Sequence, residues 1–532
     1  MFFLFLSAIL ILISAFLPGA NGMGVSVAAS GSLLVYAIMQ KRLTAWGAFV
    51  FMSFLFFGMR PLHILVNRDL GLFRFPFRIT VTTDQLADSL WWAVAGTFCF
   101  VVGALLAKST QMRYWRRRLA RAATPTFQWI LSQKTIIALI AFQIFSLVFL
   151  RGLTGGHRAS YYGSGIGAYL YDLPQVLQGG HVFTLVVIFD RWRRTHQPHV
   201  LFQLMFSSFL FLIFTYEMRN MSMFRGFYIT GVMVAGIAVL SRALPRVGYA
   251  CLILPIAVLL PLFQTLGQNR QKDLTEAVDE AEEVTTQKSS GAYWDFFNSG
   301  GDMNIFDTFV AADAYHPAFR PYALSWIYVP FHLVPRAIWK DKPMQGVLQD
   351  IKFTRKAPYS PGIVGFFLLD GGRLWMLGAM LLLGYVVGFW DMFILTMPDS
   401  ALKSCAYGIF VVNGMYLTRF FLWQWFYQVL YALIPCIVLC HFLLRRARRR
   451  REVKAEHPRD SASKMPGTQA AGEAARETAG TAARRARKAG ASESTPVERV
   501  AGEANRKSRI GKGFLTTTDQ REIECQRQPH RG

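Results

Sequence analysis

The segment Leu374–Leu395, LWMLGAMLLLGYVVGFWDMFIL, holds one charged side chain among 22 mostly apolar residues. A helix needs about 20 such residues to cross the hydrocarbon core of a bilayer, which is roughly 30 Å thick. This segment meets that requirement, and the chain repeats the pattern along most of its length. We therefore predict a transmembrane helix here and an all-α membrane protein as the fold class.

The composition agrees with the membrane class. Of the 532 residues, 53% are hydrophobic and only 17% are charged, which is too apolar for an ordinary soluble protein of this length. The formal net charge is +25. Much of this charge lies in RRARRRR (Arg445–Arg451), in the tail beyond it and in short loops between apolar runs. This distribution indicates anchoring at the cytoplasmic membrane surface and argues against nucleic acid as a partner.

Apolar runs of spanning or nearly spanning length recur along the chain and predict about 12 transmembrane helices. They are Phe2–Leu17, Val25–Met39, Ala45–Met59, Trp91–Ala107, Ile136–Leu150, Val182–Phe189 with its upstream turn, Leu201–Thr215, Tyr228–Leu240, Cys251–Leu266, Leu374–Leu395, Ala401–Tyr416 and Phe420–Leu444. Basic stretches follow the second, fourth, sixth, eighth and twelfth runs, so they share one side of the membrane. Lys and Arg accumulate in cytoplasmic loops, and we therefore predict that both termini are cytoplasmic.

These runs divide the chain into four predicted regions. They are residues 1–266, with nine helices and outer loops near 60–88, 151–176 and 217–226; residues 267–362, a large outer loop; residues 363–444, the last three helices; and residues 445–532, a basic cytoplasmic tail. The tail has almost no aromatic residues, so it cannot bury enough apolar surface to order itself, and we predict that it is disordered.

Cationic side chains in the outer loops run against the usual charge bias of membrane proteins. Arg presents a planar fork that matches phosphate oxygens, so several Arg-bearing loops predict a shared anionic target. The alternative is that these side chains extend to lipid phosphates. The outer cations are Arg151, Arg158, Arg219, Arg225, Arg336, Lys340, Lys342 and Arg373.

The predicted location restricts the chemistry. Nucleotides are not available outside the cytoplasmic membrane, the chain has no Walker A sequence, and the large loop has no DxD motif. No CxxC and no paired His motif is present, so we expect neither a metal nor a cofactor. A sugar on a lipid pyrophosphate is an activated donor that suits such a site, because clustered Arg stabilises the charge on the leaving group. An acceptor hydroxyl also needs a general base, for which the outer candidates are His157, His332, Asp302 and Asp307.

The stretch FRPYALSWIYVPFHLVPRAIWKDKP (Phe319–Pro343) resembles the large-loop signature of the Wzy-type oligosaccharide repeat-unit polymerases of bacterial O-antigen and exopolysaccharide assembly. In that family an element of the form iPR-x-lW-x-x-KP closes the large periplasmic loop. The matching residues are Pro335, Arg336, Trp339, Lys342 and Pro343, while Lys340 stands where the family usually has proline. The downstream SPGIVGFFLLDGGRLWMLGAM also resembles the family's Gly-rich entry into the next helix.

The resemblance implies a metal-independent membrane glycosyltransferase on the periplasmic face of the bacterial inner membrane. Such an enzyme moves a glycan from undecaprenyl pyrophosphate onto the next lipid-linked repeat unit, with membrane lipids and a chain-length regulator as partners. Arg336 and Lys342 would hold the pyrophosphate, Trp339 would contact the glycan, and the other outer Arg residues would complete the site. In the plainer interpretation, Pro335 and Pro343 end an interfacial helix and Arg336 binds lipid head groups.

Other functions fit parts of the same pattern. An O-antigen ligase performs the same chemistry on a different acceptor. A flippase or other transporter of lipid-linked oligosaccharide would place ionisable residues within its spans, whereas these spans are nearly free of charge. A membrane scaffold or sensor would use the basic tail as its working part.

Overall fold

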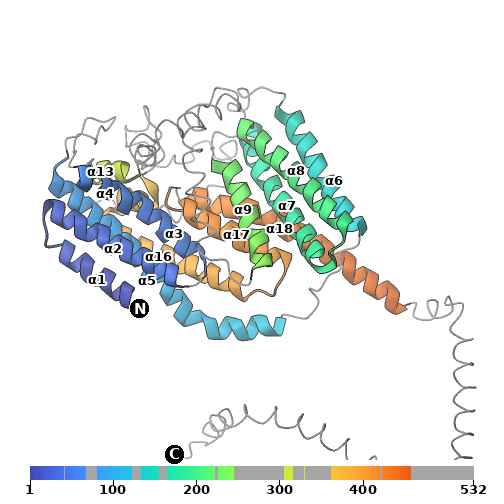
Figure 1. Ribbon diagram of the computed structural model, residues 1–532, viewed down its shortest axis with the longest axis horizontal. Helices are drawn as coiled ribbons and strands as arrows, with labels where there is room; N and C mark the ends of the chain where they lie inside the picture. The colour runs from blue at the N-terminus through green and yellow to red at the C-terminus, as the bar shows by residue number, and fades with distance from the viewer. Residues whose placement is uncertain are drawn as a thin grey trace, which may run out of the picture. The chain divides into compact units, whose positions relative to one another are not determined.

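The computed structural model describes the chain in ten segments. These are residues 1–40, 42–67, 81–122, 133–154, 165–221, 226–244, 305–315, 329, 361–419 and 422–456. In these segments the chain forms helices and no strand (Figure 1). The all-α prediction is confirmed for this part of the protein.

The helices follow the apolar runs. Every predicted run that lies in the described segments falls on a helix, and the run at 251–266 lies outside them. The helices are α1 (Phe2–Ser14), α2 (Gly19–Met39), α3 (Ala45–Phe54), the π-helix η1 (Leu55–Met59), α4 (Arg60–Asn67), α5 (Thr83–Ala122), α6 (Gln133–Thr154), α7 (Gly165–Thr195), α8 (Pro198–Met221), α9 (Gly226–Ala243), α13 (Ile305–Tyr315), α16 (Gly362–Thr396), α17 (Ala401–Tyr416) and α18 (Leu422–Glu456).

Seven stretches of the described helices are long and apolar enough to cross a membrane, which makes the chain a multi-pass membrane protein. The helix α1 and the Gly231–Ala243 part of α9 are apolar but shorter. The total of about 12 spans therefore stays a prediction. The seven stretches are Gly19–Met39, Ala45–Val66, Thr83–Ser109, Gln133–Gly152, Pro198–Glu217, Gly362–Thr396 and Gln424–Leu443.

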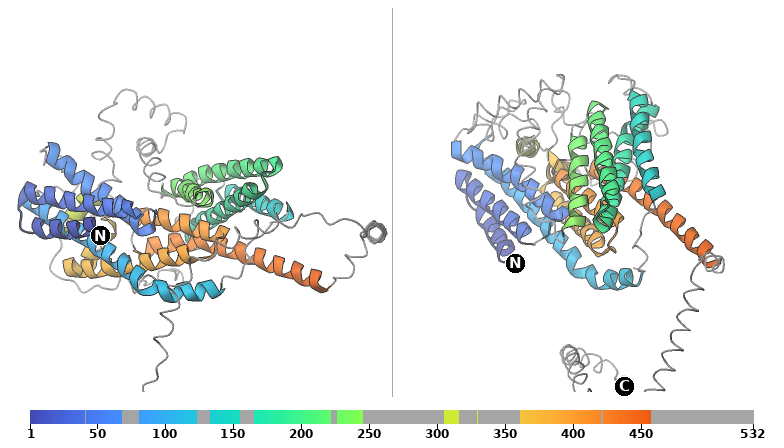
Figure 2. Two further views of the ribbon diagram at one scale, coloured as in Figure 1. Left: turned by 60° about the horizontal axis from the view of Figure 1, so that its bottom comes forward. Right: turned by 45° about the vertical axis from the view of Figure 1, so that its right-hand side comes forward.

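The most extensive interface joins α5 to α16, which lie side by side (Figures 1 and 2). Glycines allow the two backbones to touch. A Cβ atom on Gly103 of α5 would overlap the carbonyl oxygen of Leu381, and one on Gly384 of α16 would overlap the carbonyl oxygen of Phe100. Lipid tails give little hydrophobic drive for helices to associate, so close approach at small residues supplies the packing energy.

Helix α17 joins two groups of helices. It contacts α3 and α16 on one side and α7 and α9 on the other. Two of its glycines permit this, because Gly408 lies against the backbone of Val234 in α9 and Gly414 lies against the backbone of Ala45 in α3. The resulting core of α17 is buried along most of its length, including Cys405, which has no exposed surface.

Asp391, the single charged residue of the apolar segment Leu374–Leu395, has a structural role. Its carboxylate is 4% exposed and accepts hydrogen bonds from the backbone N–H groups of Ala45 (2.9 Å) and Trp46 (3.1 Å). Thr44 caps the same helix by accepting from the N–H of Gly47 at 3.2 Å. The first N–H groups of a helix have no partner within it, so Asp391 satisfies the start of α3 from a distant helix.

Several helices extend beyond their apolar runs. Helix α5 continues to Ala122 and α7 begins at Gly165, inside the loop expected at 151–176. Helix α18 continues to Glu456, past the expected start of the tail at residue 445, although the chain divides into two units between Leu444 and Arg445. The extensions of α5 and α18 are rich in Arg, Lys, Glu and Ala, which are good helix formers, so these two helices need not end where their apolar runs end. Residues 457–532 lie outside the described segments.

Candidate functional site

Most of the predicted site residues fall outside the described segments. Helix α8 includes Arg219, whose side chain is not described, and the described side chains from the prediction are Arg151, Arg373 and the base candidate Asp307. The predicted residues that lie outside the described segments are His157, Arg158, Arg225, Asp302, His332, Arg336, Trp339, Lys340 and Lys342.

Arg151 lies in the last turn of α6 and pairs with Glu217 of α8. Its Nε and Nη2 atoms lie 2.8 and 2.7 Å from the same carboxylate oxygen, Oε1. The Arg151 side chain is 64% exposed, and an exposed pair of this kind contributes at most about 1 kcal/mol to stability. Arg151 is therefore already paired with an anion of the protein.

Arg373 follows a break in α16. Gly372 has φ 81° and ψ −177°, a backbone conformation that essentially only glycine adopts, so the helix stops and restarts at this point. The indole N–H of Trp375 donates to the carboxylate of Asp370 at 3.2 Å and links the two sides of the break. Arg373 is thus the first residue of the long second part of α16, and its side chain meets α5 and α13.

The guanidinium of Arg373 joins three helices. Its Nε and Nη2 atoms donate to the two carboxylate oxygens of Asp313 in α13, at 3.1 and 3.0 Å, and Nη2 also donates to Asp88 of α5. Ser89 donates to Asp313 at 2.8 Å. The guanidinium carbon lies 5.2 Å from the ring centre of Trp92, which is a cation–π distance. We call these five residues, Asp88, Ser89, Trp92, Asp313 and Arg373, the Arg373 cluster.

The Arg373 cluster is partly open. The side chains of Arg373 and Asp88 are 40% and 48% exposed, whereas that of Asp313 is only 6% exposed. Trp92 is half-buried, and its indole N–H has no hydrogen-bond partner among the described residues. The cluster therefore presents carboxylate, guanidinium and aromatic groups on an accessible face.

A buried ion pair lies next to the Arg373 cluster on the same helix, α13. Arg60 donates to both carboxylate oxygens of Asp307, from Nε at 3.3 Å and from Nη2 at 3.0 Å, and the two side chains are 3% and 10% exposed. The π-helix η1 directly precedes Arg60. Short π-helical segments of this kind frequently occur at functional sites. Burial raises the pKa of Asp307, and Arg60 partly offsets this effect.

The chemistry of the Arg373 cluster suits a sugar. Carboxylates accept hydrogen bonds from hydroxyl groups, the guanidinium donates them, and the face of an indole ring packs on the apolar face of a pyranose. The cluster holds two carboxylates and one cation, so its net charge is negative and it is poorly suited to a pyrophosphate. No group of three His, Cys, Asp or Glu side chains in the described part of the chain is placed to hold a metal ion.

Arg373 was predicted from the sequence as an outer cation, but its partners were not predicted. Asp88 and Asp313 stand 285 and 60 residues from Arg373 in the chain, and no short-range pattern connects them. Arg60 carried a usable signal, because it is a cation directly after an apolar run, in a region predicted to be an outer loop. The predicted set of outer cations lacks Arg60.

The fold and this site define a class: a multi-pass, all-α membrane protein with a partly open charged and aromatic cluster at one end of its helices. Comparisons with protein families, with curated proteins and with solved structures find no match to this chain.

Proposed function

We propose that this protein is a membrane glycosyltransferase that polymerises oligosaccharide repeat units linked to undecaprenyl pyrophosphate, on the outer face of a bacterial inner membrane. The observation that carries the proposal is the Arg373 cluster, which combines sugar-binding chemistry with a place at the helix ends predicted to face outward. The resemblance of Phe319–Pro343 to the Wzy-type signature supports the same function.

The two parts of the site would divide the substrate between them. Asp313 and Asp88 already neutralise Arg373, so this cluster would bind neutral sugar hydroxyls. The pyrophosphate would then be held by Arg336 and Lys342 of the PRxxWxxKP element, whose cations outnumber its one carboxylate, Asp341. This division assigns Arg373 a glycan contact.

The reaction itself needs no cofactor. The acceptor hydroxyl of one lipid-linked unit attacks the anomeric carbon of the donor glycan, while the bond from that carbon to the pyrophosphate oxygen breaks. A general base takes the hydroxyl proton, and undecaprenyl pyrophosphate leaves with the bonding electron pair. Arg336 and Lys342 would stabilise the negative charge that develops on the leaving group, which is an effect of the kind that preorganised donors supply.

One observation favours a transporter as the second candidate. His181 of α7 is fully buried, with Nε2 2.6 Å from the hydroxyl of Ser146 and Nδ1 3.3 Å from the side-chain nitrogen of Gln143. Ionisable residues within membrane helices commonly mark transport pathways. Here both ring nitrogens have partners, and the ring stacks on Phe214 at 4.2 Å. These contacts make the imidazole a tie between α7 and its neighbours α6 and α8, so they favour transport less than the Arg373 cluster favours glycan transfer.

The phenotype of a deletion strain separates the candidates. A polymerase deletion retains lipid-linked single repeats on the outer face and lacks long polymer. A flippase deletion traps the repeats inside, and a ligase deletion leaves long polymer on the lipid carrier. Electrophoresis of the surface glycan, combined with extraction of lipid-linked intermediates, distinguishes these results, and either of the last two contradicts the proposal.

Arg336 tests the pyrophosphate half of the site. Removing one stabilising donor typically lowers a rate by about 10²–10³. Arg336→Ala should therefore abolish long polymer at normal protein level. Arg336→Lys keeps the charge but loses the bidentate fork, so it should be strongly impaired. Near-normal polymer length with Arg336→Lys would mean that any positive charge suffices, as head-group anchoring predicts.

Asp88 tests the glycan half, with Asp84 as its matched control. The two carboxylates lie one turn apart on α5, but only Asp88 belongs to the Arg373 cluster. Asp88→Asn weakens the acceptance of sugar hydroxyls and should shorten the polymer by several repeat units or more. Asp84→Asn makes the same charge change and should leave the polymer length as it is in the wild type. Equal polymer length in the two variants would remove Asp88 from the site.

A further inference from the structure

A second charged cluster lies where other helix ends meet. Three arginines make contacts there, in the last turns of α7 and α9, and two further cations, in the turn between α2 and α3 and in the first turn of α17, lie within electrostatic reach. The five cations are Arg42, Arg193, Arg194, Arg242 and Lys403. We call these five residues the Arg242 cluster.

Arg242 is the buried centre of this cluster, with a side chain that is 2% exposed. Its Nη2 donates to Asp190 of α7 at 2.6 Å, and its Nη1 donates to Asp399, in the turn before α17. Arg194 also contacts Asp190, at 2.9 Å. Arg193 donates to the backbone carbonyl of Arg242. These contacts hold α7, α9 and α17 together.

The charges do not balance among these groups. Five cations face two carboxylates, Asp190 and Asp399, so the seven side chains carry an excess of three positive charges. Lys403 is half-buried and lies within electrostatic reach of Asp399, which attracts it, and of Arg42 and Arg242, which repel it. In addition, the Nε of Arg242 is buried and has no hydrogen-bond partner among the described residues. Like charges held close together destabilise a structure unless an anion lies among them.

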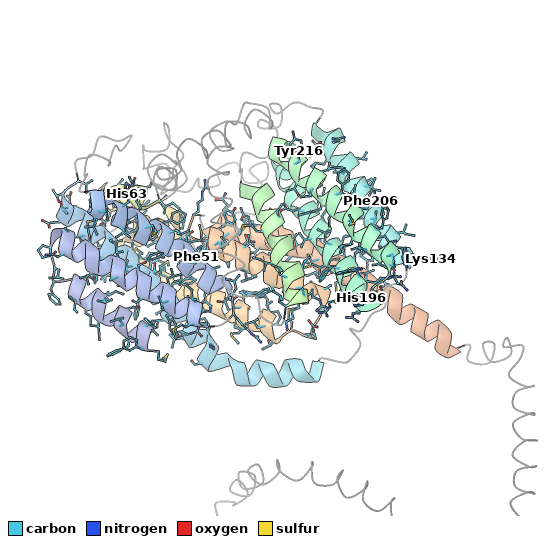
Figure 3. All side chains as sticks on the ribbon, viewed as in Figure 1. Phe51, His63, Lys134, His196, Phe206 and Tyr216 are labelled. Atoms are coloured by element: carbon cyan, nitrogen blue, oxygen red, sulfur yellow. The ribbon has the colours of Figure 1, made fainter. Side chains whose placement is uncertain are left out.

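The cluster is partly accessible, and its carboxylate Asp399 follows the end of α16 that lies opposite Arg373. The side chains of Arg193, Arg194 and Asp399 are 43%, 36% and 75% exposed. At about 1.5 Å per residue, α16 rises ~35 Å between Arg373 and Thr396, close to the thickness of a hydrocarbon core. Figure 3 shows His63, which lies one turn after Arg60, at the upper edge of the helices. It shows His196, which directly follows α7 and the Arg193 and Arg194 pair, at the lower edge.

We propose that the Arg242 cluster binds the phosphate group of an anionic phospholipid from the adjacent leaflet, and that the bound lipid stabilises the packing of α7, α9 and α17. Phosphate oxygens accept bidentate hydrogen bonds from Arg, and basic pockets between membrane helices recognise lipid head groups in this way. A lipid fits better than a free anion because the cluster lies at the ends of apolar helices, where head groups are found. This binding is independent of the proposed glycan transfer.

The test compares the thermal stability of the full-length protein in two micelle systems, one with phosphatidylcholine and one with added phosphatidylglycerol. Phosphatidylglycerol should raise the Tm of the wild type by several degrees. The Arg193→Gln/Arg194→Gln variant should lose at least half of this rise. The control variant Lys108→Gln/Lys134→Gln removes two exposed cations of α5 and α6 and should keep the full rise. Native mass spectrometry should show retained phosphatidylglycerol for the wild type and the control, with several-fold less for the Arg variant.

Three results would overturn the proposal. An equal rise of Tm in the Arg variant and the Lys control would show that surface charge alone attracts the lipid. An equal rise when inorganic phosphate is added to phosphatidylcholine micelles would assign the site to a free anion. The absence of a rise in the wild type would exclude a stabilising lipid. If the double variant does not fold, Arg194→Gln alone provides the same comparison.

Discussion

At the scale of single residues, the Arg60–Asp307 pair shows what a buried charge requires in this chain. Taking an ion out of water costs several kcal/mol, and only a well-formed pair offsets this cost. Arg60 and Asp307 meet that condition with two hydrogen bonds and almost no exposure. The pair therefore fixes the position of α4 against α13, beside the Arg373 cluster.

A double-mutant cycle measures this coupling. Arg60→Met or Asp307→Leu alone removes the opposite charge of a buried ion pair and should lower the free energy of unfolding by about 3–5 kcal/mol. The double variant removes both charges and should recover most of this loss. The yield of monodisperse protein in detergent and its unfolding temperature provide the readout. Losses that simply add in the double variant would show that the two residues act independently.

The sequence predicts which residues of this site are charged but not how they pair. The outer position of Arg373 follows from its place beside an apolar run, because hydropathy is a local property of the chain. Its contact with Asp313 depends on how α13 packs against α16, which no local pattern encodes. The sequence predicts that Arg373 binds the pyrophosphate or the glycan, and the structure shows that it is also paired with two carboxylates.

At the scale of helices, the break in α16 at Gly372 decides where Arg373 points. An alanine at this position meets no neighbouring atom, since no heavy atom lies within 4 Å of an added Cβ. It must nevertheless adopt φ 81° and ψ −177°, which costs about 1–3 kcal/mol for a residue with a side chain. The effect of the substitution is therefore conformational rather than steric.

Gly372→Ala and Gly378→Ala form a matched pair on α16. Gly372→Ala should lower the unfolding temperature and shorten the polymer, because relief of the strain displaces Arg373. Gly378 is helical and also has open space around it, so Gly378→Ala should leave stability unchanged or raise it by up to ~1 kcal/mol. Circular dichroism during heating, together with glycan electrophoresis, checks both results. Equal stability of the two variants would contradict the assigned conformation.

Helix identity was predictable from the sequence because it follows from runs of apolar residues. The ends of the helices and the irregularities within them were harder to predict from the sequence. The π-helix η1 at Leu55–Met59 depends on packing, and the continuation of α5 to Ala122 depends on helix propensity outside the membrane. A hydropathy pattern reports neither property. The cap that Asp391 provides for α3 was hidden for the same reason, since its partners are distant in sequence.

At the scale of the whole molecule, the two charged clusters lie at opposite ends of the apolar helices. The Arg373 cluster joins the start of α5 to α13 and to the start of the long second part of α16. The Arg242 cluster joins the ends of α7 and α9 to the start of α17. This arrangement agrees with the alternation of helix directions on which the predicted orientation depends.

Site-directed labelling tests that orientation. In a variant without native cysteines, a cysteine placed near Glu282 should react with an impermeant maleimide in intact cells whose outer membrane has been permeabilised. A cysteine at His196, which is exposed beside the Arg242 cluster, should react only after lysis. The reverse pattern would invert the orientation and place the PRxxWxxKP element on the cytoplasmic side.

The cap on α3 also sets an order of events during synthesis. The N–H groups of Ala45 and Trp46 emerge from the ribosome some 345 residues before the carboxylate that they bind. At translation rates of about 5–20 residues per second, α3 waits roughly 20–70 seconds for its cap. During that interval the two N–H groups lack the Asp391 carboxylate and need another partner, such as water. Newly made chains that stop before Asp391 should therefore be recognised as incomplete by membrane proteases.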